Sequence, residues 1–599
     1  MVHAPRGFGM STVFVDPIAS GSDTSLQYDS PGFLTLRNRI RWYSRALMIP
    51  NPNTTRRDVL RMLAALGLAP VATFVAGCGS DGSVFDGFPD YAYDGPLGPE
   101  NLFAHGVASG DPLPDAVILW TRLDPGAGAG TIQAWFEVAT DPEMRRRVVA
   151  GWIETDSDRD WTVKLDATGL QPGTTYFYRF RALGRASTIG RTRTAPVGDV
   201  ERLRLGVVSC SNYASGWFHA YRFVAERDDL DAVLHLGDYI YEYGSGEYGS
   251  VRLCDPPREI LTLEDYRTRY SQYRRDPDLQ EVHRQHPFIA VWDDHESADN
   301  SWQGGAENHQ PGTEGEWPGR RQAAWRAYSE WMPTRTPDPE RIYRVLKFGN
   351  LKFGNLVQLT MLDTRTVGRS QQASGILDPA IRDETRTMLG AEQEAWFDEQ
   401  MRASVATWNL VGQQVMMAPL KLQGAPNSAG GGLIANVDQW DGYFAARARL
   451  FRSVRDSGAT NLVVLSGDIH SSWGSELTDD PNDPAVYDPA SGRGAVGVEF
   501  VCPGVSSPGF PLAGAEGLLA TGRQHDPHIK YAELTLRGYL VVDVTRDRVQ
   551  CTWVHLDRVD DASGANQVDT ASWSVAAGTT KLMEDAAPAD AGEHRPLAP

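Results

Sequence analysis

Carboxylate and imidazole side chains gather directly after short apolar runs at three places in the chain. These clusters are Gly237-Asp238 after the run 232–236, Asp293-Asp294-His295-Glu296 after 288–292, and Gly467-Asp468-Ile469-His470 after 462–465. A carboxylate that follows a buried strand loses hydration and needs compensation, and metal ions supply it directly. The three clusters therefore predict a metal site built from distant parts of the sequence.

The residue types indicate what the first metal ion would be. The thiolate of Cys210, the carboxylate of Asp238 and the phenolate of Tyr241 would place three formal negative charges about one ion, with neutral His470 as a fourth ligand. That much negative charge favours a trivalent ion, so the prediction is iron(III).

A second ion that shares Asp238 and takes Asp294 and Asp468 would meet mainly oxygen ligands, which suit calcium, magnesium or manganese. Two ions roughly 3.5 to 4 Å apart can hold both the attacking and the leaving oxygen of a phosphoryl displacement, and they acidify the attacking water. The expected substrate is a phosphate ester. His295, next to Asp294, would stabilise the transition state or protonate the leaving group.

Several of these residues also have a purely structural interpretation. Cys210 can be an inert buried thiol, and His235, which precedes the site on its strand, can be a core histidine. Asp293 can cap a helix or support a ligand by hydrogen bonding. Arg365 can form a structural ion pair, although a guanidinium is well suited to bind phosphate.

The elements that must position these residues begin at about Arg202. From there short apolar strands alternate with helical segments, which predicts an α/β domain over 198–558 whose sheet is covered on both faces. The strands are expected at 203–209, 232–236, 288–292, 356–362, 408–411 and 462–465. In open α/β sheets, groups at the carboxyl ends of strands meet in one crevice, so the clusters should converge.

The preceding segment, 102–197, has a different pattern. Alternating runs at 116–120, 133–138 and 176–182 are separated by turn residues, which is typical of an all-β sandwich. The phrase Leu170-Gln171-Pro172-Gly173-Thr174-Thr175-Tyr176 resembles the late strands of a fibronectin type III module. We therefore expect a smaller β-sandwich ahead of the α/β domain.

The N-terminal region carries the pattern of an export signal over 48–78. Arg56-Arg57 precede the apolar run 62–76, which is too short to span a bilayer comfortably and is typical of twin-arginine export. Val75-Ala76-Gly77-Cys78 resembles a lipoprotein processing site, so Cys78 is a candidate for lipidation. The expected location is periplasmic or on the cell surface, with the membrane contacted only through the signal or a lipid anchor.

The remaining terminal segments carry no chemistry. Residues 1–47 are expected to stem from a start codon assigned too early, and 79–101 reads as a linker rich in Gly, Asp and Pro. The tail 559–599 is rich in Ala, Asp, Gly and Pro and is expected to be disordered.

Composition narrows the class of partner. The chain has 599 residues, with 57 Lys and Arg against 77 Asp and Glu, and 57 − 77 gives a net charge of −20. Such a charge repels a polyphosphate backbone and excludes a role in coating nucleic acid, so an anionic substrate must meet a local positive centre. The four cysteines besides Cys78 lack the regular spacing of a zinc site.

Two further patterns lead to no functional prediction. Gly244-Ser245-Gly246-Glu247-Tyr248-Gly249 fits the letters of a dinucleotide fingerprint, but no helix pattern follows it, so no such site is expected. The pentapeptide at 346–350 is repeated at 351–355, and because five is odd, the insertion would reverse the strand faces unless it were looped out.

The motifs, taken in order, resemble those of the PhoD-type alkaline phosphatases and phosphodiesterases. The resemblance extends from about residue 102 to 556. It rests on the phrases at 103–112, 119–122, 235–243, 292–296, 362–365, 466–472 and 497–500.

This resemblance implies a smaller N-terminal β-sandwich joined to a calcineurin-like metallophosphoesterase domain, which is itself a β-sandwich with flanking helices. It also implies a site of iron with calcium, and export by the twin-arginine machinery. It places Cys210, Asp238, Tyr241, Asp294, Asp468 and His470 at metal-site positions, and His295 and Arg365 in the active site. Cys210 stands where other metallophosphoesterases have an Asp-x-His motif, and Asp468 stands where they have a histidine. Both departures are those of PhoD-type proteins.

The sequence thus predicts an exported hydrolase of phosphate esters. The alternative is a surface-anchored lipoprotein that binds a glycan or a partner through its sandwich domain and its 17 tryptophans, with structural metals only. The strand-end clusters favour the enzyme, because a binding module needs no such convergence.

Overall fold

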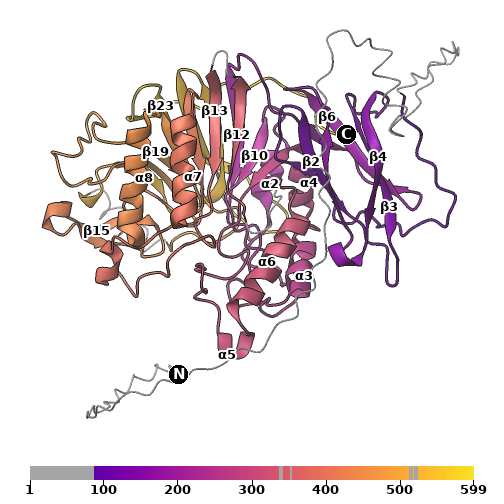
Figure 1. Cartoon of the computed structure of the whole chain (residues 1–599), viewed down its shortest axis with the longest axis horizontal. Coiled ribbons are helices and arrows are strands. Elements are labelled where there is room, and N and C mark those ends of the chain that lie inside the picture. Colours follow the sequence, from indigo (N-terminus) through magenta and orange to yellow (C-terminus); the bar gives the residue numbers. More distant parts are fainter. Residues whose placement is uncertain (1–86, 336–340, 351–353, 512–513, 515–516, 518–523) are drawn as a thin grey trace, which may run out of the picture. The chain divides into compact units, whose positions relative to one another are not determined.

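The computed structural model describes residues 87–335, 341–350, 354–511, 514, 517 and 524–599 (Figure 1). The expected start region, the signal with Cys78 and the first residues of the linker lie outside these ranges. Within them, no helix is both long and apolar enough to cross a bilayer.

A ten-stranded sheet contains the first three strands that carry site residues. Its central strands β9 (Arg202–Val208), β10 (Ala232–His235) and β11 (Pro287–Ala290) are parallel. On one side of β9 the order continues with β21 (Arg537–Thr545), β22 (Arg548–Leu556), β23 (Gln567–Ala576) and β24 (Leu582–Asp585). On the other side of β11 it continues with β1 (Val107–Gly110), β2 (Ala116–Arg122) and β5 (Thr162–Thr168).

A seven-stranded sheet contains the others. Its strands, in spatial order, are β12 (Arg344–Asn350), β13 (Gly354–Met361), β14 (Trp408–Gly412), β17 (Leu462–Ser466), β19 (Gly497–Val501), β18 (Ser472–Leu477) and β20 (Ile529–Glu533). β13, β14, β17 and β19 are mutually parallel. A short ribbon of β15 (Lys421–Gly424) and β16 (Gly432–Ile434) lies outside both sheets.

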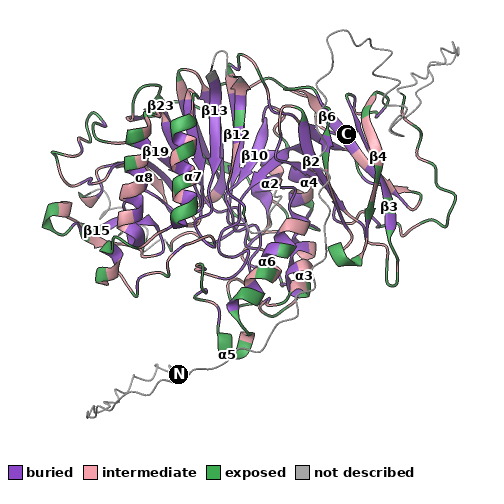
Figure 2. Cartoon of the chain, in the orientation of Figure 1, coloured by how far each residue is buried: buried purple, intermediate pink, exposed green. Residues whose placement is uncertain are grey.

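The two large sheets share one core, which Figure 2 shows as a continuous buried layer. Val207 and Phe288 of the ten-stranded sheet belong to the same buried cluster as Val357, Leu410 and Val463 of the other. A two-sheet sandwich therefore replaces the single covered sheet that the strand and helix alternation suggested, and it agrees with the metallophosphoesterase fold expected from the family resemblance.

Helices cover the outer faces. Along the chain they are α2 (His219–Ala225), α3 (Leu263–Tyr273), α4 (Pro277–Gln285), α5 (Pro311–Glu314), α6 (Trp317–Trp331), α7 (Gly390–Ala403) and α8 (Phe444–Ser457), with 3-10 turns at Ser157–Arg159, Pro379–Arg382, Asn427–Ala429 and Trp440–Tyr443. Phe397 of α7 and Leu450 of α8 pack against Val411 and Val464, on the second face of the seven-stranded sheet.

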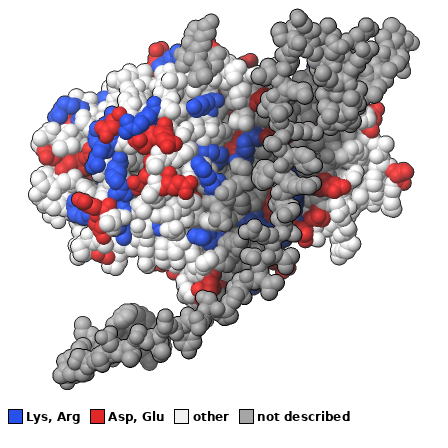
Figure 3. All heavy atoms as spheres, viewed as in Figure 1, with Lys and Arg blue, Asp and Glu red and all other residues white. Residues whose placement is uncertain are grey.

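Basic and acidic side chains lie side by side over α7 and α8 (Figure 3). Two of the ion pairs there are Arg402–Asp398 and Arg449–Glu394.

The smaller sandwich forms from β1, β2 and β5 against a second sheet. That sheet contains β4 (Arg147–Thr155), β3 (Ile132–Ala139), β6 (Thr175–Ala182), β7 (Arg185–Ala186) and β8 (Gly190–Arg193). Leu119 of β2 packs in the small sandwich, whereas its neighbour Trp120 belongs to the main core. Because β1 pairs with β11, the boundary expected at residue 197 does not separate two independent sheets.

The prediction of a disordered tail is wrong for 559–599. β23 pairs with β22 along its whole length, and Val575 and Leu582 are buried in the main core. The Ala, Gly and Asp content of the segment hid an alternating pattern, and the exposed edge of β22 supplies the partner that this pattern needs.

The repeated pentapeptide lies at a hairpin. The first copy ends β12, and Gly354 and Asn355 of the second copy begin β13, with Asn350 opposite Gly354 and an irregular register at Phe348 and Gly349. The described residues of both copies therefore belong to paired strands, and 351–353 lie outside the described residues.

Candidate metal centre

The candidate site residues of both sheets lie just beyond the carboxyl ends of parallel strands. Cys210 follows β9, Asp238 follows β10, and Asp294 with His295 follows β11. Arg365 follows β13, and Asp468 with His470 follows β17. The common strand direction brings these residues from both sheets to one edge of the sandwich.

Four of the residues assigned to metal adopt a left-handed backbone conformation. The φ angles are 58° at Cys210, 57° at Asp238, 66° at Asp468 and 56° at His470. Non-glycine residues rarely take this conformation, and the strain is usually found at functional sites. The shared conformation therefore marks these four positions as candidates for function.

The side chains expected to hold the first ion converge. One ligand atom each of Cys210, Asp238 and His470 lies within 4.8 Å of the others. The Tyr241 hydroxyl donates to Asp238 Oδ2 at 2.9 Å and lies 3.1 Å from His470 Nε2. Ser507 Oγ in turn donates to the Tyr241 hydroxyl at 2.7 Å.

The chemistry of this set fits a bound cation. Asp238 Oδ1 is buried and has no hydrogen-bond partner among the residues that the structure describes. Burial, together with neighbouring negative charge, raises the pKa values of Cys210, Asp238 and Tyr241 well above their ordinary values. Burial lowers the pKa of His470 to about 4, which keeps its imidazole neutral and able to bind a metal. A cation would relieve the cost of burying the three acidic groups.

Two of the three carboxylates expected at the second ion, Asp294 and Asp468, lie beside Arg365, whose side chain is fully buried. Its Nε donates to Asp293, its Nη1 donates to both oxygens of Asp438 at 2.9 and 2.7 Å, and its Nη2 donates to Asp468. Asp294 Oδ2 lies 3.5 Å from the same Nη2. The structure therefore favours the ion-pair interpretation of Arg365 over the expected phosphate-facing one, because its nitrogens are already engaged.

His295 is held by a residue that the sequence analysis did not single out. Its Nδ1 lies 2.7 Å from Oε2 of the fully buried Glu242. Burial alone would lower the pKa of His295, but the charges of Glu242, Asp294 and Asp238 outweigh it and raise the pKa well above the usual value. His295 also stacks on Tyr241, with ring centroids 4.1 Å apart.

Other supporting residues also escaped prediction. Glu296 accepts hydrogen bonds from the backbone N–H groups of Asp238, Tyr239 and Asp293, at 3.1, 2.6 and 2.7 Å. Gln439 donates to Asp468. Glu296 ends the Asp293-Asp294-His295-Glu296 cluster, so its place after a strand could have identified it as a site residue. Asp438, Gln439 and Ser507 follow no strand that carries a predicted site residue, so the sequence offered no indication of their role.

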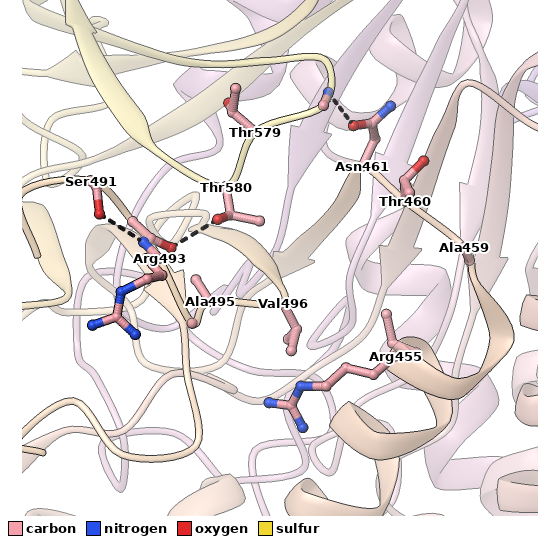
Figure 4. A pocket seen from close by; sticks show the side chains of 14 residues that line it. Arg455, Ala459, Thr460, Asn461, Ser491, Arg493, Ala495, Val496, Thr579 and Thr580 are labelled. Atoms are coloured by element: carbon pink, nitrogen blue, oxygen red, sulfur yellow. Dashed lines mark hydrogen bonds between the residues drawn. The ribbon is translucent and has the colours of Figure 1, made fainter. Parts of the chain in front are cut away.

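A cavity of about 580 Å³ lies away from this centre (Figure 4). Its lining includes Arg455 in the last turn of α8, Asn461 before β17 and Arg493 before β19. These positions are at the amino ends of β17 and β19, the opposite edge from the candidate metal centre. None of the candidate site residues lines it.

Comparison with known proteins agrees with the fold. The profile described as PhoD-like phosphatase matches residues 205–553, and that of the PhoD-like phosphatase N-terminal domain matches 96–196. Alkaline phosphatase D of Bacillus subtilis (strain 168) is 36% identical over 461 residues, which cover 74% of this chain and 76% of the relative. A solved structure of PhoD superposes with a TM-score of 0.75 at 34% identity, covering 83% of this chain and 94% of the solved chain. The resemblance predicted from the motifs is confirmed, and this chain belongs to the PhoD-like phosphatase family.

Proposed function

We propose that this protein is an exported, metal-dependent phosphatase that hydrolyses phosphate esters. One observation carries the proposal: Cys210, Asp238, Tyr241 and His470 converge at the carboxyl edge of the sandwich in a chain of the PhoD-like phosphatase family. The name of the Bacillus subtilis relative, alkaline phosphatase D, supports the same class of reaction.

The first ion, iron(III), would be held by Cys210, Asp238, Tyr241 and His470. The second ion, calcium or else magnesium or manganese, would be held by Asp294 and Asp468 and would share Asp238. Bound there, the ions would supply positive charge to the phosphate oxygens and lower the pKa of the attacking water. Asp238 Oδ1 supports the shared position, because it is a buried acceptor at the centre for which the described residues offer no hydrogen-bond donor.

His295 would protonate the leaving group. Glu242 accepts a hydrogen bond from Nδ1–H and its negative charge favours the charged imidazole, so that a second proton is held at Nε2. Asp299 Oδ1 is 4.0 Å from Nε2, too far for a hydrogen bond, which leaves this proton available to an alkoxide oxygen. General acid catalysis of this kind contributes roughly 10² to 10⁴ in rate.

Elemental analysis of the purified protein, prepared without chelators, tests the proposal. We expect near-stoichiometric iron with a divalent ion, and loss of both metals and of phosphatase activity in Asp238→Asn. Well-folded protein without iron would contradict the ligand assignment, and protein without any bound metal would favour the binding-lipoprotein alternative. Asp238→Asn protein that keeps its metals and activity would exclude the shared role of Asp238.

Export is proposed from the twin arginines at 56–57 and the processing pattern ending at Cys78. Cell fractionation combined with mass spectrometry of the mature N-terminus tests it. We expect protein outside the cytoplasm that begins with a lipid-modified Cys78, and Cys78→Ala should release it from the membrane. Arg56→Lys with Arg57→Lys should retain the full-length chain in the cytoplasm.

A further inference from the structure

The loop Gly244–Gly249, which fits the letters of a dinucleotide fingerprint, borders the candidate metal centre. No helix occurs between Gly244 and Thr262, so the fingerprint interpretation fails here as the sequence predicted. The loop instead presents Tyr248 to the site. The ring centroid of Tyr248 lies 5.8 Å from that of Tyr241, 6.0 Å from that of His295 and 6.5 Å from that of His470.

Tyr248 lies at the open side of the centre. Tyr241 and Asp238 are buried, whereas Tyr248, Asp468 and His470 are only partly buried. A substrate whose phosphate reaches the centre from solvent would therefore bring its leaving group past the Tyr248 ring.

Hydrogen bonds and close backbone packing hold the loop at Tyr248 in place. The Tyr248 carbonyl accepts hydrogen bonds from Ser215 Oγ at 2.7 Å and from Asn212 Nδ2 at 3.2 Å. Gly246 N–H donates to the Gly249 carbonyl at 3.1 Å and closes the turn. Gly249 has a φ of 145°, and a Cβ there would lie 2.6 Å from the Ala214 backbone. A fixed aromatic ring costs little entropy when it binds a partner.

The ring of Tyr243 lies next to that of Tyr248, with centroids 5.3 Å apart. Its hydroxyl donates to Asp299 Oδ2 at 2.9 Å, which ties the side chain to the segment that follows His295. The Tyr248 ring contacts the Tyr241, Tyr243, His295 and His470 rings but is only partly buried, so its exposed part can pack against an incoming ring. Aromatic rings pack best against other flat rings, in offset or edge-to-face geometry.

We propose that Tyr248 is a specificity-determining residue whose ring packs against a flat ring in the leaving group of the phosphate ester. This inference rests on the proposed phosphatase function and names its substrate class as esters of nucleosides or of other ring-bearing alcohols. Stacking on an aromatic side chain is worth enough to change affinity by about tenfold or more.

The test compares two substrates that differ only in the ring. Adenosine 5′-phosphate and ribose 5-phosphate share the same primary alkoxide leaving atom, and each is used as the monoester and as its methyl diester. We expect kcat/KM to be about tenfold higher for the adenosine member. Tyr248→Leu, which keeps an apolar side chain without the ring, should abolish that preference, mostly through KM. Tyr248→Phe, which keeps the ring, should retain it.

Metal content is measured for each variant, so that a damaged centre is recognised. Equal kcat/KM for the two members in the wild type, or equal preference in Tyr248→Leu and Tyr248→Phe, would overturn the role of Tyr248 while leaving the phosphatase function intact. Failure of the metal-loaded wild type to hydrolyse all four esters would contradict the phosphatase function itself, and this inference with it.

Discussion

The role of the buried Arg365 guanidinium in holding the proposed metal ligands can be tested by substitution, with Arg369 as the control. The Arg365 guanidinium contacts Asp293, Asp438 and Asp468, and a lysine cannot span these three carboxylates because its ammonium is a single point. Arg365→Lys should therefore leave Asp468 misplaced and lower divalent-metal affinity and activity by about 10- to 100-fold. Elemental analysis and kcat measure the two effects.

Arg369 provides the matched control for this substitution. It is equally buried and also contacts Asp438, but its other hydrogen bonds go to Tyr443 and to the Thr364 carbonyl, away from the proposed ligands. Arg369→Lys should keep its metals. Equal metal loss in the two variants would mean that Arg365 acts only through general stability.

The pairing of His295 with Glu242 predicts a shift in the pH profile. Glu242 raises the pKa of His295, so the protonated acid persists to higher pH in the wild type. Glu242→Gln removes the negative charge of Glu242 and therefore lowers the pKa of His295. The fall in kcat/KM that accompanies loss of the His295 proton should then move to lower pH. Asn308→Ala, which removes a 2.9 Å hydrogen bond to Glu242 but no charge, should move it less.

Replacing the histidine itself separates acid catalysis from metal binding. His295→Ala should lower kcat by about 10²-fold while metal content remains nearly intact. Loss of metal together with activity would instead identify His295 as a ligand, which its closeness to Asp238 and Asp294 permits.

Much of the site could be predicted from sequence because its residues follow buried strands at the same edge. Asp238, Asp294 and His470 are each recognisable in this way, without knowledge of the folded chain. Asp438 and Ser507 could not be found, since they reach the site through loops whose paths depend on the packing of both sheets. The role of Arg365 also depended on contacts with residues 72 to 103 positions away.

At the scale of elements, the turn after β10 depends on Gly237. Its φ is 110°, and a Cβ there would lie 2.4 Å from Asp293 Cβ and 2.6 Å from Asp293 N. Gly237→Ala should therefore push two strand-end loops apart, lower the thermal unfolding midpoint and reduce metal content. Gly169→Ala is the control, because Gly169 has a φ of 84° and nothing within 4 Å of the added Cβ.

The control variant should show only the backbone strain of about 1 to 2 kcal/mol and keep its metals. If Gly237→Ala behaves in the same way, the close approach of the two loops is not needed to build the centre.

Strand positions were predictable because the apolar runs are short and bounded by turn residues. The expected strands at 203–209 and 462–465 are observed as Arg202–Val208 and Leu462–Ser466. The division of these strands between two sheets was not predictable from the apolar runs. A strand that is buried on both faces has the same continuous apolar sequence in whichever sheet it lies. β23 and β24 were missed because a polar composition outweighed their alternation.

At the scale of the whole molecule, the last residues connect parts that are distant in sequence. Arg204 donates to the carbonyl groups of Ala589 and Asp590, next to its ion pair with Asp229. Ala598 exchanges two hydrogen bonds with Gln285 of α4 and packs with Phe177 of the smaller sandwich. The C-terminal segment thus contacts both the main sheet and the smaller sandwich.

Removal of residues 587–599 should therefore destabilise the protein without changing its chemistry. Buried donors on Arg204 and Gln285 would lose their partners, and each such loss costs about 1 to 3 kcal/mol. We expect a lower thermal unfolding midpoint, with kcat and metal content unchanged well below that temperature, because the segment lies at the amino end of β9, away from the strand ends that carry the ligands. His594→Ala is the control, since its ion pair with Asp228 is largely exposed and contributes little. A truncated protein that unfolds at the wild-type temperature would show that the sheets and the smaller sandwich hold together without this segment.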